Sequence, residues 1–362
     1  QLDIFTAPSM QLGSRASKKY SDPNAWHNQF YSLVTTKIDE EIFKPLFPEG
    51  KKSGRPNASI RILVAMSVLK EGFGCSDEDL FEKCEFDLLT RKALGMELLT
   101  DVTPSIDTYY LFRRRICEYQ ERTGIDLMQL CFEQLAGKHV HLLKISGKCV
   151  RMDSKLIGSN IARQSRYELI HTTLVKFLKT CTLTHLSPEQ EERAKEYLKE
   201  DSSKTVYRSD SDTLQSNLAR IGNFIMEMLA VFPATSPAHD LLLRLFEEQY
   251  VVMDGKAVLR DKKEVKADSL QNPNDPDATY RAKNDQKVQG YVTNITETVE
   301  EGKPNIITSV QVETAVFADC HFLQEAVENS ERVTDSTIED LYADGAYQSP
   351  DNREFAKNHN AM

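Results

Sequence analysis

The chain has 362 residues, and 45 Lys and Arg against 55 Asp and Glu give it a formal net charge of −10. This length suggests two or three domains of about 100–200 residues each. No apolar run approaches the roughly 18 residues that a membrane-spanning helix needs, so no membrane partner is expected. Seven cysteines without a CxxC pair indicate reduced thiols and a cytoplasmic location. By itself, the acidic balance argues against nucleic acid as a partner.

The charge is unevenly distributed along the chain. Residues 1–150 hold 20 basic and 20 acidic residues, so residues 151–362, with 25 against 35, carry the whole −10. This shift predicts a domain boundary near 145–150. We expect a polar leader over residues 1–50, a helical domain over 51–145 and a second domain over 146–362. Because the chain begins with Gln1 and ends at Met362, soon after the predicted start of a helix, we expect a fragment.

The helical domain is predicted from apolar periodicity. The run Ile60–Leu69 is long enough for a buried helix, and Ser76 with Asp79 forms the S-x-x-D start of a shorter one. Apolar residues then recur at near-helical spacing from Ile106 to Tyr119. That spacing leaves three consecutive basic residues partly outward, namely Arg113, Arg114 and Arg115.

The spacing of apolar residues changes after residue 146. Lys148–Ile157 mixes β-branched and apolar residues and predicts a strand, whereas residues 162–250 return to helical patterning. Further strands are predicted at Val288–Thr298, Ile306–Val316 and Ile338–Tyr342, a helix at His321–Asn329, and a last helix begins at Ser349-Pro350. The order of strand, helical block, two strands, helix, strand and helix predicts an α+β protein.

Two acids stand out in this pattern. Asp153 lies inside the first predicted strand, where a carboxylate is costly unless it is paired or binds a metal. Asp344 follows the last predicted strand and precedes Gly345. Two acids on neighbouring strands would form an oxygen-rich site suited to Mg²⁺ or Mn²⁺. Taken alone, each could equally be an ordinary strand-end or turn acid, and the spacing leaves both alternatives open.

Several motifs occur in a specific order. Ser53-Gly54-Arg55-Pro56 precedes the first apolar helix, and Thr103–Thr108 leads into Phe112–Arg115. The strand with Asp153 reads D-S-K; Asp275–Ala278 reads DPDA and is followed by Lys287–Tyr291, and Ala343–Tyr347 is followed by Ser349. In this order the chain resembles the DDE transposases of bacterial insertion sequences, most closely the IS5/IS1182-like group, over roughly residues 25–362.

The resemblance implies a fold. It predicts a helix-turn-helix-like N-terminal DNA-binding domain and an RNase H-like α/β catalytic domain with residues 162–250 as a large helical insertion. The first catalytic strand would carry Asp153, and the fourth would end at Asp344. The family also needs a Glu on a later helix. Since Glu354 comes directly after the fourth strand, we expect it to be a surface residue. The third acid, with the last strand and helix, would lie beyond Met362.

The resemblance also implies an activity and partners. Two Mg²⁺ or Mn²⁺ ions, held by Asp153, Asp344 and the third acid, would catalyse cleavage and strand transfer at the ends of an insertion sequence. The partners would be double-stranded DNA, as terminal inverted repeats and target, and a second copy of the chain. For phosphate contacts we expect the following basic residues: Lys51, Lys52, Arg55, Arg113, Arg114, Arg115, Arg281, Lys283 and Lys287.

Two other functions remain open at this stage. A chain without its third acid could be a non-catalytic DNA-binding remnant that inhibits the complete enzyme. It could also be another metal-dependent nuclease of RNase H-like fold. A helical Glu some tens of residues beyond Met362 would favour the transposase.

Overall fold

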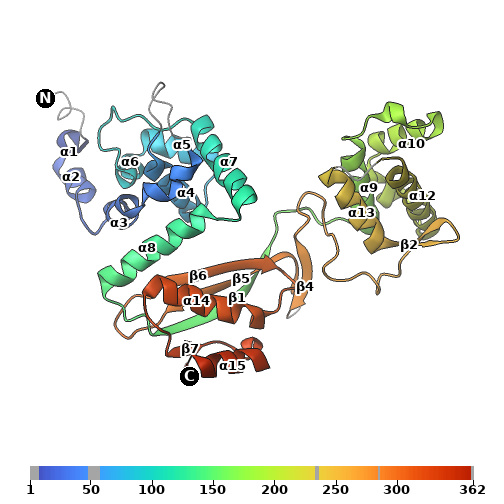
Figure 1. Ribbon diagram of the computed structural model, residues 1–362. Helices are drawn as coiled ribbons and strands as arrows, with labels where there is room; N and C mark the ends of the chain where they lie inside the picture. Colours follow the sequence, from blue (N-terminus) through green and yellow to red (C-terminus); the bar gives the residue numbers. More distant parts are fainter. Residues whose placement is uncertain (1–7, 48–57, 233–235, 284–285, 360–362) are drawn as a thin grey trace.

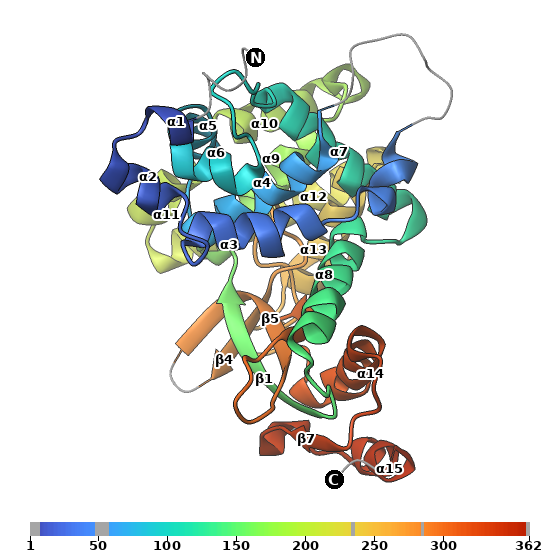
Figure 2. The ribbon, with the colours of Figure 1, turned by 90° about the vertical axis from the view of Figure 1, so that its left-hand side faces the viewer.

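The computed structural model describes residues 8–47, 58–232, 236–283 and 286–359. The chain forms two helical units and a mixed β-sheet (Figure 1). The first helical unit ends in a long helix, α8 (Leu127–Leu143), which descends to the sheet and packs beside α14 (Leu323–Thr334), as the turned view shows (Figure 2). None of the described helices is long and apolar enough to cross a membrane.

The first helical unit confirms the predicted helices and extends them. The predicted helices are α4 (Ile60–Phe73), α5 (Asp77–Phe86) and α7 (Ile106–Thr123), and a further short helix, α6 (Leu88–Leu94), lies between α5 and α7 in the sequence. The predicted start at Ser76 is a reciprocal capping box with Asp79. The apolar faces of these helices, with Phe43 and Leu80 fully buried among them, form one continuous hydrophobic core.

The sequence predicts a polar leader over residues 1–50, but the structure shows short helices in the described part of this segment. Its described part forms α1 (Pro8–Gln11), α2 (Ser14–Tyr20), α3 (Trp26–Leu33) and two 3₁₀ segments, Thr35–Lys37 and Glu40–Leu46. Helix α3 packs against α6, and the buried Thr35 hydroxyl donates to the Ala93 carbonyl at 2.7 Å. These helices are short and polar on their outer side, so their sequence carries little periodicity. Tertiary packing stabilises them.

In chain order, the second helical unit follows the first strand of the sheet and precedes the second. It comprises α9 (Arg166–Leu178), α10 (Pro188–Lys199), α11 (Ser202–Arg208), α12 (Ser211–Val231) and α13 (Pro237–Gln249), followed by the hairpin β2 (Tyr250–Met253) and β3 (Lys256–Leu259). This unit has a hydrophobic core of its own, which includes Ala257 and Leu270. It therefore extends past residue 250, the expected end of the helical block.

The sheet is built from β1 (Cys149–Gly158), β4 (Thr279–Lys283), β5 (Gln286–Thr298), β6 (Ile307–Thr314) and β7 (Asp340–Tyr342). Strand β5 pairs antiparallel with β1, β4 and β6, whereas β7 pairs with β1 in parallel. The longer predicted strands are confirmed to within two residues. β4 was not predicted, because its five residues, TYRAK, carry no clear apolar alternation.

The sheet has a covered face and an open one. Val150 and Met152 of β1 and Val292 of β5 point into a core under α14, which also contains Phe322 and Tyr347. The intervening side chains of β1, those of Arg151, Asp153 and Lys155, are exposed on the opposite face. This period-two alternation is what a strand covered on one side requires. The last helix, α15 (Pro350–Asn358), begins at the predicted Ser349-Pro350.

Candidate metal-binding active site

The parallel pairing of β1 with β7 sets the position of the two predicted acids. Cys149 lies opposite Asp340, Val150 opposite Leu341, and Arg151 opposite Tyr342. Two more residues along both chains bring Asp153 level with Asp344. The backbone at Asp344 stays extended, with φ −73° and ψ 172°. Since neighbouring strands lie about 4.8 Å apart, continuing this register would bring the two acids close together on the open face of the sheet.

Both carboxylates are exposed and have no cationic partner in the described part of the chain. One oxygen of Asp153 accepts the Ser154 amide, and one oxygen of Asp344 accepts the Ala346 amide, each at 2.8 Å. Among the described residues, no Lys, Arg or His nitrogen lies within 4.0 Å of either carboxylate. Two hard oxygen donors at the surface suit Mg²⁺, which commonly binds one or two carboxylates and keeps several waters. The pair therefore fits part of a metal site.

A buried polar network supports the loop that carries Asp344. The Tyr347 hydroxyl donates to Asn294 Oδ1 at 2.7 Å, and Asn294 Nδ2 donates to Gln311 Oε1 at 2.9 Å. Burial raises the pKa of Tyr347, and the charges of Asp319, Asp153 and Asp344 raise it further. The phenol thus stays protonated as a donor beneath the acid pair. Helix α15 also holds this loop, since Asn352 donates to the Tyr347 carbonyl at 2.8 Å.

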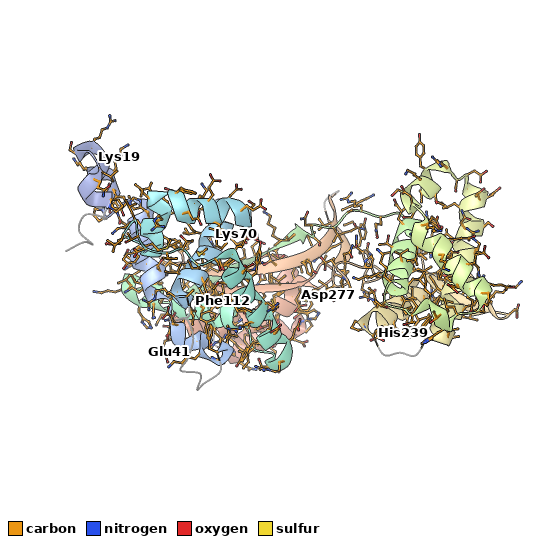
Figure 3. All side chains as sticks on the ribbon, turned by 90° about the horizontal axis from the view of Figure 1, so that it is seen from above. Lys19, Glu41, Lys70, Phe112, His239 and Asp277 are labelled. Carbon is orange, nitrogen blue, oxygen red and sulfur yellow. The ribbon has the colours of Figure 1, made fainter. Side chains whose placement is uncertain are left out.

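The DPDA and K..GY motifs contact each other away from the acids. The Asp275 carboxylate accepts hydrogen bonds from the hydroxyls of Ser159 and Tyr291. A Cβ at Gly290 would lie 2.2 Å from the Ile157 carbonyl oxygen, so only glycine allows β1 and β5 to approach there. Figure 3 places Asp277, in the same loop, between the sheet and the second helical unit. These motifs therefore join the two units and do not line the acid pair.

The first group of predicted DNA contacts lies on α7. Arg113 is 3.8 Å from Asp77, Arg114 is 3.6 Å from Glu118, and the Arg115 guanidinium stacks 5.4 Å from the Phe47 ring centroid. Arg113 and Arg114 are exposed, whereas Arg115 is half-buried. Such surface ion pairs are weak and could exchange for phosphates. Three further candidates, Lys51, Lys52 and Arg55, lie outside the described residues.

The second group lies at the β4–β5 end of the sheet. Arg281 faces Val288 on β5, whereas Asp153 faces Ile295, seven positions or about 24 Å along the strand. The Arg281 guanidinium donates to the carbonyls of Ala315 and Phe317, and it pairs with Asp319 at 3.3 Å. It therefore has a structural role at the end of β6. Lys283 ends β4, and the Lys287 side chain is exposed.

The structure agrees with the expectation for Glu354, which is exposed on α15. No group of three or more His, Cys, Asp or Glu side chains in the described part of the chain could hold a metal ion. The acid pair is thus the whole carboxylate set that the described residues bring to the site.

Sequence reasoning missed one cation on the same face as the acids. Lys155 follows Asp153 by two positions on β1, so both side chains point to the open face, and Lys155 is exposed without an ion-pair partner among the described residues. The period of two within the D-S-K motif could have identified it.

The comparisons with known proteins concern the first helical unit. Residues 19–115 match the family described as Transposase domain (DUF772). The match begins ahead of residue 51, in keeping with the packing of α3 against α6. No curated protein and no solved structure matches the chain. The similarity of residues 19–115 to this transposase-domain family is consistent with an insertion-sequence transposase of the IS1182 type.

Proposed function

We propose that the chain is a DNA transposase whose sheet domain has an RNase H-like fold and uses Asp153 and Asp344 as metal-binding carboxylates. The observation that supports the proposal is the parallel register of β1 and β7, which ends with Arg151 opposite Tyr342 and, continued by two residues, would bring Asp153 level with Asp344. The transposase domain at residues 19–115 independently supports the same class of activity.

The topology of the sheet supports the assignment of its fold. Three strands, β1, β5 and β6, pair antiparallel, and α14 follows them and covers one face. The fourth strand, β7, then returns beside β1 in parallel. This is the arrangement expected of an RNase H-like sheet in which the first and fourth strands carry the catalytic acids. The second helical unit takes the place of the insertion after the first strand.

The two acids have a defined part in phosphodiester chemistry. A divalent ion, when bound, supplies Lewis-acid activation of the attacking oxygen and neutralises charge on the phosphate. Asp153 and Asp344 would hold that ion through the oxygens that do not accept a backbone amide. Lys155, on the same strand face, would orient the phosphate of the DNA strand. Arg113 and Arg114 on α7 would contact the duplex backbone elsewhere, and a second copy of the chain would hold the other DNA end.

Metal binding provides a direct test. Titration of the chain with Mn²⁺, followed by the loss of the electron paramagnetic resonance signal of free Mn²⁺, should show binding that Asp153→Asn and Asp344→Asn each abolish. Glu354→Gln is the matched control, because it removes an exposed carboxylate from α15. If Mn²⁺ binding is unchanged in both site variants, the acid pair is not a metal site.

Non-catalytic DNA binding is a second candidate function, and the small number of carboxylates at the site favours it. Only two carboxylates meet at the site among the described residues, so the chain could bind transposon ends without cutting them. Cleavage of a labelled duplex that carries the ends of the encoding element, with Mg²⁺ present, separates the two functions. Cleavage that disappears in Asp153→Asn supports the transposase, whereas duplex binding without cleavage supports the non-catalytic DNA-binding protein.

A further inference from the structure

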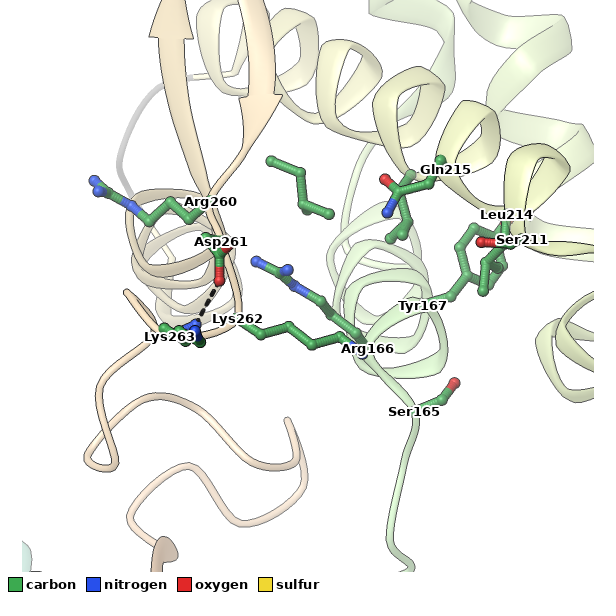
Figure 4. A pocket seen from close by; sticks show the side chains of 12 residues that line it. Ser165, Arg166, Tyr167, Ser211, Leu214, Gln215, Arg260, Asp261, Lys262 and Lys263 are labelled. Atoms are coloured by element: carbon green, nitrogen blue, oxygen red, sulfur yellow. Dashed lines mark hydrogen bonds between the residues drawn. The ribbon is translucent and has the colours of Figure 1, made fainter.

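The second helical unit contains a cavity of about 770 Å³ that is distant from the acid pair. It lies between the start of α9, the start of α12 and the turn that follows β3 (Figure 4). A second cavity of about 520 Å³ adjoins it and shares two of its lining residues, Arg166 and Lys262. Both cavities are lined by the turn at residues 260–266, and we call the two together the hollow.

Arg166 reaches from the first turn of α9 toward that turn (Figure 4). Its guanidinium donates to the side-chain oxygen of Gln249 at 2.7 Å and to the Gln249 carbonyl at 3.3 Å. No carboxylate of the described chain lies within 4.0 Å of it. Burial lowers the pKa of this half-buried arginine, against the opposing influence of Tyr250 and Asp261. An incoming anion would stabilise a half-buried cation that has only neutral hydrogen-bond acceptors around it.

The turn contributes more positive charge. Arg260, Lys262 and Lys263 line the first cavity, and Lys266 lines the second. None of these four has an ion-pair partner among the described residues. Asp261 is the acid that lines the hollow, and one of its oxygens accepts the Lys263 amide at 2.9 Å. The hollow thus holds five cationic side chains against one carboxylate.

This positive charge contrasts with its surroundings. Residues 151–362 carry an excess of ten acidic residues, so five cations around one hollow are not the average surface of this half of the chain. The cations follow one another along the turn instead of converging on one point. An extended polyanion, which presents phosphates at regular intervals, suits that arrangement better than a single small anion does.

We propose that this hollow binds the phosphate backbone of a DNA strand, with Arg166 as its buried anchor and Lys262 and Lys263 as its rim. The inference rests on the proposed function, because it takes DNA as the polyanion. It assigns the second helical unit a direct part in holding DNA, beyond the contacts from α7 and from the open face of the sheet.

The test uses a double variant, Lys262→Gln with Lys263→Gln, and a fluorescein-labelled duplex followed by anisotropy. Both lysines are exposed, so folding should be unaffected. Each phosphate contact contributes about 0.9 to the slope of log affinity against log salt, or a factor of about 8 at 0.1 M salt. We therefore expect about a 60-fold loss of affinity at 0.1 M salt, and a slope smaller by about 1.8.

The matched control is the double variant Lys179→Gln with Lys199→Gln. It removes the same charge from exposed positions of the same unit, since Lys179 directly follows α9 and Lys199 is the last residue of α10, and neither lysine lines either of the two cavities. Its affinity should stay within about twofold of the unmodified chain. A third variant, Arg166→Gln, should weaken duplex binding about 8-fold by the same relation.

The outcomes separate the two proposals. If the unmodified chain binds the duplex and the Lys262/Lys263 variant binds equally well, the hollow is not a DNA site, although the transposase proposal stands. If the unmodified chain binds no duplex at any salt concentration, both proposals fail. If a fluorescent ADP analogue binds the chain and is lost in Arg166→Gln while duplex affinity is unchanged, the hollow is a nucleotide site, and the assignment to DNA is overturned.

Discussion

The hydrogen bond beneath the acid pair can be tested by Tyr347→Phe. Tyr347 is 2% exposed, and its hydroxyl donates to Asn294, which is fully buried. The substitution keeps the ring and therefore leaves no cavity, but it removes the donor to Asn294 Oδ1. An unsatisfied buried acceptor costs about 1–3 kcal/mol. We expect local destabilisation of about 2 kcal/mol around β5 and β7.

Amide hydrogen exchange measures this change locally, which matters because three units need not unfold together. A loss of about 2 kcal/mol corresponds to roughly a 30-fold faster exchange, since every 1.4 kcal/mol is tenfold. Peptides that span 288–298 and 340–349 should show this faster exchange. Peptides from α12, which lies in the separate core of the second helical unit, should exchange at an unchanged rate.

Tyr207→Phe is the matched control, because Tyr207 is 91% exposed and should leave every exchange rate unchanged. If exchange in 340–349 stays within twofold of the unmodified chain in Tyr347→Phe, the hydrogen bond to Asn294 does not stabilise the loop that carries Asp344. Other contacts would then hold Asp344 in place.

Three other predictions address the rest of the chain. Gly290→Ala should cost at least about 2 kcal/mol, because the new Cβ would meet the Ile157 carbonyl oxygen; a thermal midpoint that does not fall would contradict this. Burial lowers the pKa of His171 from its ordinary 6.5, so the stability it contributes is complete above pH 6.5 and is lost as the pH falls toward the folded-state value. His171→Gln should flatten the decline of the thermal midpoint between pH 7 and 5.5, and an equal decline in both proteins would exclude this role. Burial raises the pKa of Cys84 to about 12, so a thiol reagent at pH 8 should label Cys84 only after unfolding. The exposed Cys117 should be labelled within minutes. Mass spectrometry of the labelled peptides measures both reactions, and labelling of Cys84 in the folded chain would contradict this prediction.

Local sequence determined the elements with strong periodicity or a clear start. The helix α7 follows from its apolar spacing, α5 follows from the S-x-x-D start at Ser76, and α15 follows from Ser349-Pro350 at its beginning. Strand β1 and the motif order also identified Asp153 and Asp344. Capping and amphipathic burial depend on residues only a few positions apart, so they are visible in the sequence.

Elements without such local signals depend on tertiary contacts for their conformation. Helix α3 is stabilised by packing against α6, and β2, β3 and β4 are strands of four or five residues. In strands this short, pairing with a neighbour decides the conformation more than propensity does.

The sites divide in the same way. The sequence alone named the two acids, but only the parallel register of β1 and β7 brings them level on one face. The contacts of the Arg281 guanidinium with the Ala315 and Phe317 carbonyls and with Asp319 are visible only in the fold, and its phosphate contact stays a prediction. The basic hollow around Arg166 joins segments about a hundred residues apart, so no local pattern predicts it. Residue type sets what a side chain can bind, and long-range packing decides which side chains meet.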